Sequence, residues 1–144
     1  MIIDSIRKFI LTCPFLNESS DGGIRLNVNY LGEDSTVYSI EEIPCDPVLN
    51  TYINGDSERQ FQFIFCSREP YGSDIMQNLA NSDFYEDFAN WIEEQNSLGN
   101  YPTLEGKCRS EEIKVTSPGY AFQVATDKAR YQIELRLKYL KKRK

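Results

Sequence analysis

The sequence predicts an α+β fold in which a mainly antiparallel sheet has helices packed on one face. Apolar residues recur at helical spacing in two regions, at the N-terminus and in the middle of the chain. Elsewhere they alternate with polar residues at a period of two, as in half-buried strands. Short turn-like segments separate neighbouring strands, which favours hairpins over the long crossovers that a parallel sheet needs.

The chain has 144 residues, the size of one domain, and we expect residues 1–140 to form it, followed by a basic tail at 141–144. Charge is spread unevenly. Residues 1–127 carry 21 acidic and 8 basic side chains, whereas residues 128–144 carry 1 acidic and 8 basic side chains. A basic end on an acidic body favours contact with phosphate or with an acidic protein surface, although a solvated, frayed terminus has the same composition.

The first predicted helix covers residues 2–11. Its apolar residues share the three- and four-residue spacing of one helix face and are Ile2, Ile3, Ile6, Phe9 and Ile10. Pro14 ends this helix near Thr12, because the residue before a proline avoids helical backbone angles. Residues 17–23 are rich in Asn, Ser, Asp and Gly, which predicts a loop.

Three strands are predicted next. Residues 24–31 alternate between apolar and polar side chains, and residues 36–43 are predicted to return as a second strand. The intervening "GEDS" has the composition of a turn, so these two strands are expected to form a hairpin. Residues 44–57 are predicted to be a connection with a turn at Asn54-Gly55. The strand at 59–67 is apolar on both sides, which predicts a central strand covered on each face.

Two helical segments are predicted between residues 73 and 99. The first begins at Ser73 and Asp74, and its apolar side is formed by Ile75, Met76 and Leu79. The "NSD" at 81–83 interrupts it, because Asp83 and Glu86 have the spacing of a new helix start. The second segment continues to about Asn96, and Gly99 ends the region.

The segment "YEDFANWIEEQNSLGN" at 85–100 contains four carboxylates, which raises the question of an active site. The apolar stripe of this helix is formed by Phe84, Phe88, Trp91, Ile92 and Gln95, and the acids lie largely away from it. A catalytic carboxylate pair needs a shared apolar cleft that separates the two pKa values. We therefore interpret these acids as the solvent side of an amphipathic helix.

The C-terminal third is predicted to be a long hairpin. Strand patterns lie on both sides of Pro118-Gly119, which predicts a bulge or bend there, and "ATDK" at 125–128 predicts a turn. Residues 130–139 alternate without exception between apolar and polar side chains. At 3.3 Å per residue, this strand would be roughly 30 Å long.

The sequence offers little for catalysis. It has no histidine, no phosphate-binding glycine motif, and four cysteines, at 13, 45, 66 and 108, that lack the paired spacing of a zinc site. Asp34, Glu41, Glu42 and Asp46 have no spacing typical of a calcium loop. No basic start followed by an apolar run indicates a signal peptide, and no apolar stretch approaches 20 residues. We expect no enzyme activity, no cofactor, no metal and no small-molecule substrate.

Three stretches carry a resemblance to a known family: "YSIEEIPCDPVLNTYINGDSERQFQFIFCSREPYG", "FYEDFANWIEEQN" and "ARYQIELRLKY". In this order they resemble small prophage proteins of Gram-positive bacteria that are encoded in tail-morphogenesis clusters and labelled tail terminators or minor capsid proteins. The resemblance extends over most of residues 2–140. It implies a tail-terminator-like α+β fold.

The resemblance also implies a function. Tail terminators form a ring, commonly hexameric, on the head-proximal end of the tail tube, where the ring stops tube growth and provides a docking surface. The implied partners are further copies of the chain and the tube protein. Contact with a sheath protein, with a head-completion protein or with passing DNA is left open. The particle is a phage or a headless R-type bacteriocin, assembled in the bacterial cytoplasm without membrane contact. The alternative is a head–tail connector, adaptor or minor capsid protein from the same cluster.

A ring closes through contacts between two different patches, and an acidic body with a basic C-terminal strand provides two such patches. We expect residues 136–144, the end of the C-terminal strand with the tail, to meet an acidic surface on the next subunit or the tube. The segment at 67–72 and the connection at 44–57 are further candidates for contact. The individual residues are Arg68, Glu69, Tyr71, Arg136, Lys138, Lys141, Lys142, Arg143 and Lys144.

Overall fold

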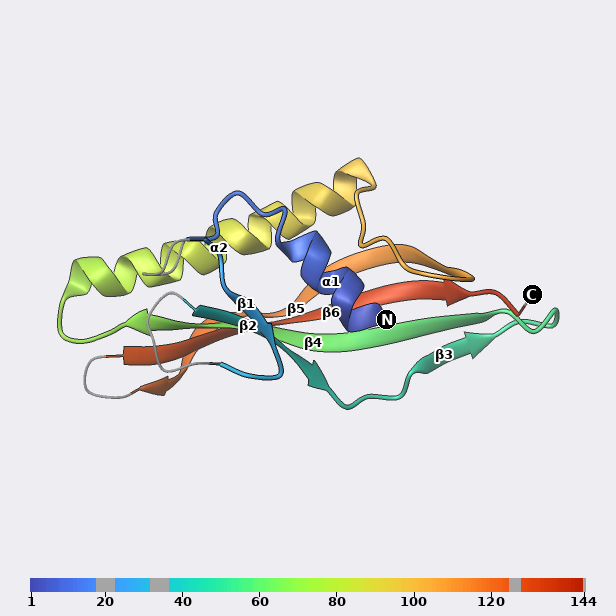
Figure 1. Ribbon diagram of the computed structural model, residues 1–144, viewed down its shortest axis with the longest axis horizontal. Coiled ribbons are helices and arrows are strands. Elements are labelled where there is room, and N and C mark those ends of the chain that lie inside the picture. Colours follow the sequence, from blue (N-terminus) through green and yellow to red (C-terminus); the bar gives the residue numbers. More distant parts are fainter. Residues whose placement is uncertain (18–22, 32–36, 125–127, 144) are drawn as a thin grey trace.

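The computed structural model describes residues 1–17, 23–31, 37–124 and 128–143, and the side chains of 123 and 124 are not described. Two helices lie on the same side of a long, twisted sheet (Figure 1). In chain order the elements are α1 (Ile2–Ile10), β1 (Leu26–Val28), β2 (Val37–Ile43), β3 (Val48–Thr51), β4 (Ser57–Pro70), α2 (Ile75–Leu98), β5 (Cys108–Val124) and β6 (Lys128–Lys141). The predicted α+β class is confirmed, with helices on one face.

The sheet is mixed, with the strand order β1-β2-β4-β6-β5, and β3 pairs with the start of β4. Every pairing is antiparallel except that of β1 with β2, which is parallel. The predicted hairpin of residues 24–31 with 36–43 is therefore wrong. β1 ends at Val28 because Asn29 has a left-handed φ of 54° and turns the chain out of the strand. The predicted turn at 32–35 lies outside the described residues, as does most of the predicted loop at 17–23.

Long strands form the body of the sheet. β4 and β6 are each 14 residues long and pair along their whole length, from Ser57 opposite Lys141 to Pro70 opposite Lys128. β5 is 17 residues long, and its register shifts between Ser117 and Tyr120, which confirms the predicted bulge at Pro118-Gly119. The predicted turn at 125–128 lies largely outside the described residues.

β4 is central, as predicted, but helices cover only one of its faces. Phe63 and Phe65 are buried under the helices, whereas Ile64, on the opposite face, is only partly buried. Cys66, on the same face as Ile64, is fully buried, so the predicted cover on both faces is confirmed at Cys66 and only partial at Ile64. The predicted connection at 44–57 also contains a strand, β3, which forms a hairpin with β4 through a turn at Asn54-Gly55.

α2 is one continuous helix of 24 residues rather than two segments. Gly99 ends the helix with a φ of 74°, as predicted. The N-cap is Asp74, whose side chain accepts a hydrogen bond from the Met76 amide at 3.0 Å, rather than the predicted Ser73. The predicted break at 81–83 does not occur. Asn81 is buried, and its amide donates to the Pro70 carbonyl at 2.9 Å, which satisfies its polar side chain within the helix.

A continuous helix presents one buried stripe, and that stripe is formed by Asn81, Tyr85, Phe88, Trp91 and Ile92. Continued toward the start of the helix, the same stripe includes Gln77 and Asn78. Ile75, Met76 and Leu79 therefore lie off it and are 72%, 73% and 53% exposed. Their predicted role as the buried side of a separate helix is wrong.

The core lies between the helices and the sheet. It contains Ile6 and Ile10 from α1, Phe88 and Ile92 from α2, and the side of β6 that faces the helices. The β6 residues are Ala129, Tyr131, Ile133, Leu135, Leu137 and Tyr139, which confirms the predicted alternation. No helix among the described residues is both long enough and apolar enough to cross a membrane.

Candidate interaction surfaces

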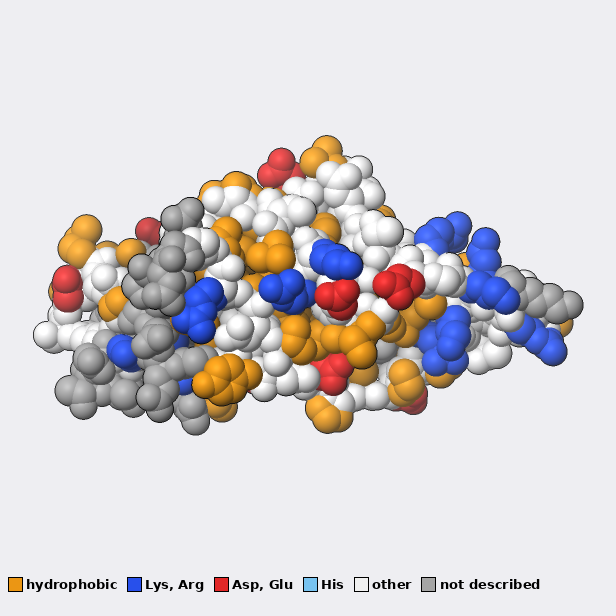
Figure 2. All heavy atoms as spheres, viewed as in Figure 1, with side chains coloured by type: hydrophobic (Ala, Val, Ile, Leu, Met, Phe, Trp, Pro, Cys, Tyr) orange, Lys and Arg blue, Asp and Glu red, His pale blue; other side chains and the backbone are white. Residues whose placement is uncertain are grey.

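Basic side chains gather at the end of the molecule where the C-terminus lies. Antiparallel pairing places the start of β5 beside the end of β6, with Cys108 opposite Lys141, and the Lys142 amide donates to the Lys107 carbonyl at 2.9 Å. We define the basic tip as Lys107, Arg109, Lys141, Lys142 and Arg143, all of which are exposed. Figure 2 shows the blue side chains of this end. Sequence analysis identified only the β6 half of the tip, because Lys107 and Arg109 are distant in sequence.

The chain end is held against the β3–β4 turn. The Arg143 amide donates to Asp56 Oδ1 at 3.0 Å, and the side chain of Arg143 lies against Gly55. Residues up to 143 are therefore fixed to the sheet. The alternative of a frayed terminus does not describe residues 141–143, and Lys144 lies outside the described residues.

The β3–β4 turn exposes apolar side chains. Ile53 is fully exposed, and Leu49 and Tyr52 are each 42% exposed. Backbone hydrogen bonds from Tyr52 to Asp56 (2.8 Å) and from Gly55 to Tyr52 (2.9 Å) fix the turn, and Gly55 has a φ of 94° that favours glycine. We call Leu49, Tyr52 and Ile53 the apolar knob.

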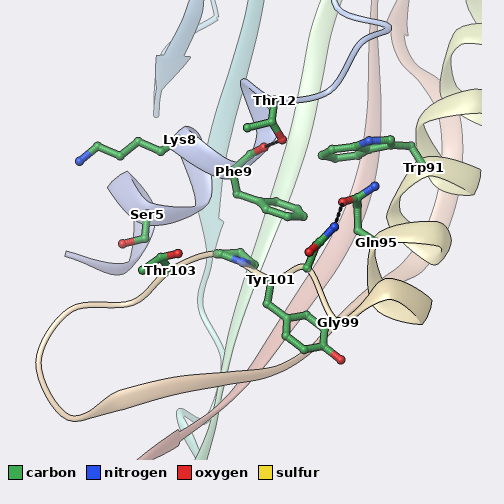
Figure 3. Close-up of a pocket in the computed structure, with 11 residues that line it drawn as sticks. Ser5, Lys8, Phe9, Thr12, Trp91, Gln95, Gly99, Tyr101 and Thr103 are labelled. Atoms are coloured by element: carbon green, nitrogen blue, oxygen red, sulfur yellow. Dashed lines mark hydrogen bonds between the residues drawn. The ribbon is translucent and has the colours of Figure 1, made fainter.

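A hollow of about 750 Å³ lies between α1, the C-terminal part of α2 and the segment that follows α2. Phe9 and Trp91, which both line it, pack against each other with ring centroids 5.2 Å apart (Figure 3). Tyr101 and Pro102 line it from the following segment, and polar side chains such as Gln95 and Thr103 complete it. We call this space the aromatic hollow. Its volume lies within the range of about 300–1,000 Å³ that is typical of binding pockets.

The outer side of α2 is acidic. Its exposed acids are Asp83, Glu86, Asp87, Glu93 and Glu94, and the helix has no lysine or arginine. The interpretation of the 85–100 carboxylates as a solvent-facing side is confirmed by their exposure. Sequence analysis also placed Trp91 on the buried stripe, but its position beside Phe9 depends on the packing of α1 against α2.

Ion pairs connect the strands on the sheet face opposite the helices. Arg130 binds Glu41 with both terminal nitrogens, at 2.7 and 3.0 Å, and lies over the Phe122 ring at 5.7 Å. Lys138 contacts Glu58 at 3.0 Å, an ion pair that lowers the pKa of Glu58 and raises the pKa of Lys138. Arg136 contacts Glu112 at 3.4 Å.

The predicted contact residues are therefore dispersed. Lys141, Lys142 and Arg143 lie together in the basic tip, but Arg136 and Lys138 are engaged in the ion pairs of the sheet face. The segment at 67–72 was expected to be an exposed loop, whereas residues 67–70 form the end of β4. Arg68 lies within that strand and Tyr71, partly buried, follows it.

Glu69 is buried, with 7% exposure, which is a correction to its predicted place on a contact surface. Burial raises the pKa of Glu69 to about 7. The Ser67 hydroxyl lies 2.6 Å from the Tyr85 hydroxyl, which donates to the Tyr131 carbonyl at 3.1 Å. The Glu69 carboxyl thus belongs to a buried polar network under α2.

All four cysteines are free thiols. Burial raises the pKa of Cys13 to about 11 and that of Cys66 to about 12, so neither supplies a thiolate at neutral pH. Among the described residues, no three His, Cys, Asp or Glu side chains are grouped closely enough to hold a metal ion.

Comparison of the chain with protein-family models, curated proteins and solved structures finds no match.

Proposed function

We propose that the chain is a structural tail-terminator protein, which forms a ring on the head-proximal end of a phage or phage-like tail tube, ends tube growth and offers a docking surface. The sequence resemblance motivates this proposal, including the expected hexamer. The observation that carries it is the separation of two unlike surfaces: a basic tip at one end of the sheet and an acidic helix, α2, over its helix-covered face. Unlike patches on one chain allow the head-to-tail contacts that close a ring.

The basic tip is suited to contact because its charges are exposed. Two of the described acids lie near this end. Asp56 accepts a hydrogen bond from the Arg143 amide, and Glu58 forms an ion pair with Lys138. Basic side chains at an exposed end attract an acidic protein surface over roughly 10 Å at 0.1 M salt. An acidic surface on the next subunit or on the tube is the partner we propose for them.

Electron microscopy of tails made with and without this gene tests the proposed role. Without a terminator, tube growth has no stop, so the tails should vary widely in length, and a plasmid copy of the gene should restore a uniform length. Tails of normal length that lack heads would instead favour the head–tail connector. Normal particles without the gene would contradict both roles.

The charge of the tip is tested in the purified protein. We expect Lys141→Glu combined with Lys142→Glu to weaken assembly, with or without tube protein, and the loss to depend on salt. Lys141→Arg combined with Lys142→Arg preserves the charge and is the matched control. Sedimentation at low and moderate salt measures the effect. Deletion of residues 141–144 is a less specific test, because it also removes the contact of Arg143 with Asp56. Equal assembly of the Glu variant and the Arg variant at both salt levels would contradict this use of the tip.

A further inference from the structure

The apolar knob is exposed on its aliphatic side chains, Leu49 and Ile53, and the Tyr52 hydroxyl donates to Glu58 Oε2 at 3.1 Å. Ile53 is 108% exposed on a turn that hydrogen bonds hold in place. Single exposed apolar residues are common on protein surfaces. Here, however, three such residues, Leu49, Tyr52 and Ile53, occupy one short hairpin beside the basic tip. A fixed turn with an aliphatic end loses little conformational freedom when it enters a pocket.

The aromatic hollow has the complementary shape and chemistry. It is lined by the rings of Phe9, Trp91 and Tyr101, and its volume of about 750 Å³ exceeds that of one aliphatic side chain. An inserted isoleucine would meet the exposed parts of these aromatic side chains, and the volume leaves room for a neighbouring side chain such as Tyr52. Polar groups at the border of the hollow, among them Thr103 and Gln95, are available to a turn backbone.

Charge around the two surfaces is complementary. Lys142 and Arg143 lie beside the turn that carries Ile53. Glu94 is exposed on α2 between Trp91 and Gln95, which both line the hollow, and Lys8 at the hollow is already paired with Asp4 at 3.2 Å. A copy that inserts its knob would bring basic side chains toward the acidic helix. Such complementarity sets the orientation of a contact.

The knob cannot fill the hollow of its own chain. The β3–β4 turn lies at the end of the sheet, whereas α1 and the C-terminal part of α2 stand over the sheet away from that end (Figure 1). The occupant must therefore be another molecule. A second copy presents an apolar knob flanked by basic residues, which matches an aromatic hollow beside the exposed Glu94 of α2.

We propose that the β3–β4 turn of one copy inserts Ile53 into the aromatic hollow of the next copy, with Lys142 and Arg143 against Glu94. The contact joins two different surfaces, so repeated copies form a head-to-tail series that can close. It rests on the proposed ring function and supplies the subunit contact of that ring.

Sedimentation of the full chain, alone and with tube protein, tests the contact. We expect Ile53→Asp to weaken self-association by about ten-fold or more, because a charge would enter an aromatic space. Ile75→Asp is the matched control, since Ile75 is also highly exposed, at 72%, but lies at the start of α2. Thr103→Arg should weaken association from the side of the hollow. The single tryptophan, Trp91, reports occupancy through a fluorescence change that Ile53→Asp should abolish.

Two mixtures make the test specific. Lys142→Glu alone should weaken association. Mixing the Lys142→Glu variant with the Glu94→Lys variant should restore association, whereas mixing it with the Glu86→Lys variant should not. Each of Ile53→Asp and Thr103→Arg keeps one intact surface, so an equal mixture should form a dimer and stop there. Continued growth of that mixture, or equal effects of Ile53→Asp and Ile75→Asp, would overturn the contact.

The outcomes separate this contact from the proposed function. If the wild type stays monomeric alone and with tube protein, or if Ile53→Asp assembles like the wild type, the contact is wrong. The tail-length experiment then still decides the function. If association depends on Ile53 but loss of the gene leaves tail length unchanged, the contact stands and the terminator role is wrong. A fluorescence change caused only by tube protein would assign the hollow to the tube and overturn the contact between copies.

Discussion

At the scale of single residues, Gly119 is required by the packing of Tyr85. A Cβ atom at position 119 would lie 2.5 Å from Tyr85 Cβ, and Tyr85 is buried and hydrogen-bonded, so it cannot move aside. We expect Gly119→Ala to destabilise the fold by about 1–3 kcal/mol. Gly72→Ala is the control, because a Cβ there meets nothing within 4 Å. Urea denaturation measures both variants, and equal stabilities would contradict the prediction.

Glu69 makes the stability of the fold depend on pH. Its buried carboxyl has a pKa of about 7, raised from 4.5, so the folded state binds its proton more tightly than the unfolded state does. Below pH 4.5 the carboxyl is neutral in both states and burial has no charge penalty. As pH rises from 4.5 to 7, this group makes the folded state progressively less stable, and above pH 7 the loss is constant.

The polar network explains why the neutral form suits this site. Tyr85 donates its one hydroxyl proton to the Tyr131 carbonyl, so Ser67 donates to Tyr85. The Ser67 oxygen is then an acceptor for a protonated Glu69. The side-chain amide of a glutamine at position 69 also carries a hydrogen-bond donor.

We therefore expect Glu69→Gln to have little effect near pH 4 and to stabilise the protein at pH 8, by up to about 3 kcal/mol. Denaturation across this pH range measures the difference between variant and wild type. Glu86→Gln, on the exposed side of α2, is the control and should show no such trend. A stability difference that stayed constant with pH would contradict the assignment.

At the scale of elements, Asn96 fixes the C-terminal part of α2 to β5. Its Oδ1 accepts from the Ile113 amide at 2.9 Å, and its Nδ2 donates to the Ile113 carbonyl. The side chain thus satisfies both backbone groups of a residue on an edge strand. This contact holds the helix end that contributes Trp91 and Gln95 to the aromatic hollow.

We expect Asn96→Ala to cost about 1–3 kcal/mol of stability and to speed hydrogen exchange at the Ile113 amide. Asn90→Ala, at an exposed position of the same helix, should do neither. Thermal unfolding and amide exchange followed by NMR give the two readouts. Slow exchange at Ile113 in the Asn96 variant would show that the side chain does not protect this edge.

Local patterns predicted most elements because local residues determine them. The alternation at 130–139, the proline after α1 and the glycine after α2 each act within a few residues. The failures involve tertiary packing. The pairing direction of β1 depends on the backbone at Asn29, and the break at 81–83 is absent because Asn81 finds the Pro70 carbonyl, a partner that helix propensity does not reveal.

At the scale of the whole molecule, the exposed basic side chains of the tip gather at one end of the sheet. Sequence analysis located the basic C-terminus, but Lys107 and Arg109 join it only through the register of β5 on β6. The aromatic hollow likewise combines Phe9 with Trp91, 82 positions apart in the sequence. Sequence periodicity assigned both residues to buried faces and gave no indication that their rings meet beside a hollow.

The two edges of the sheet have a consequence for how copies can meet. β1, at one edge, is only three residues long, and β5, at the other edge, has four register shifts along its length and the side chain of Asn96 on its backbone. Short or bulged edges are poor templates for strand addition, the route by which flat sheets aggregate. These two edges are thus poor sites for strand addition, which favours side-chain surfaces as the means of association.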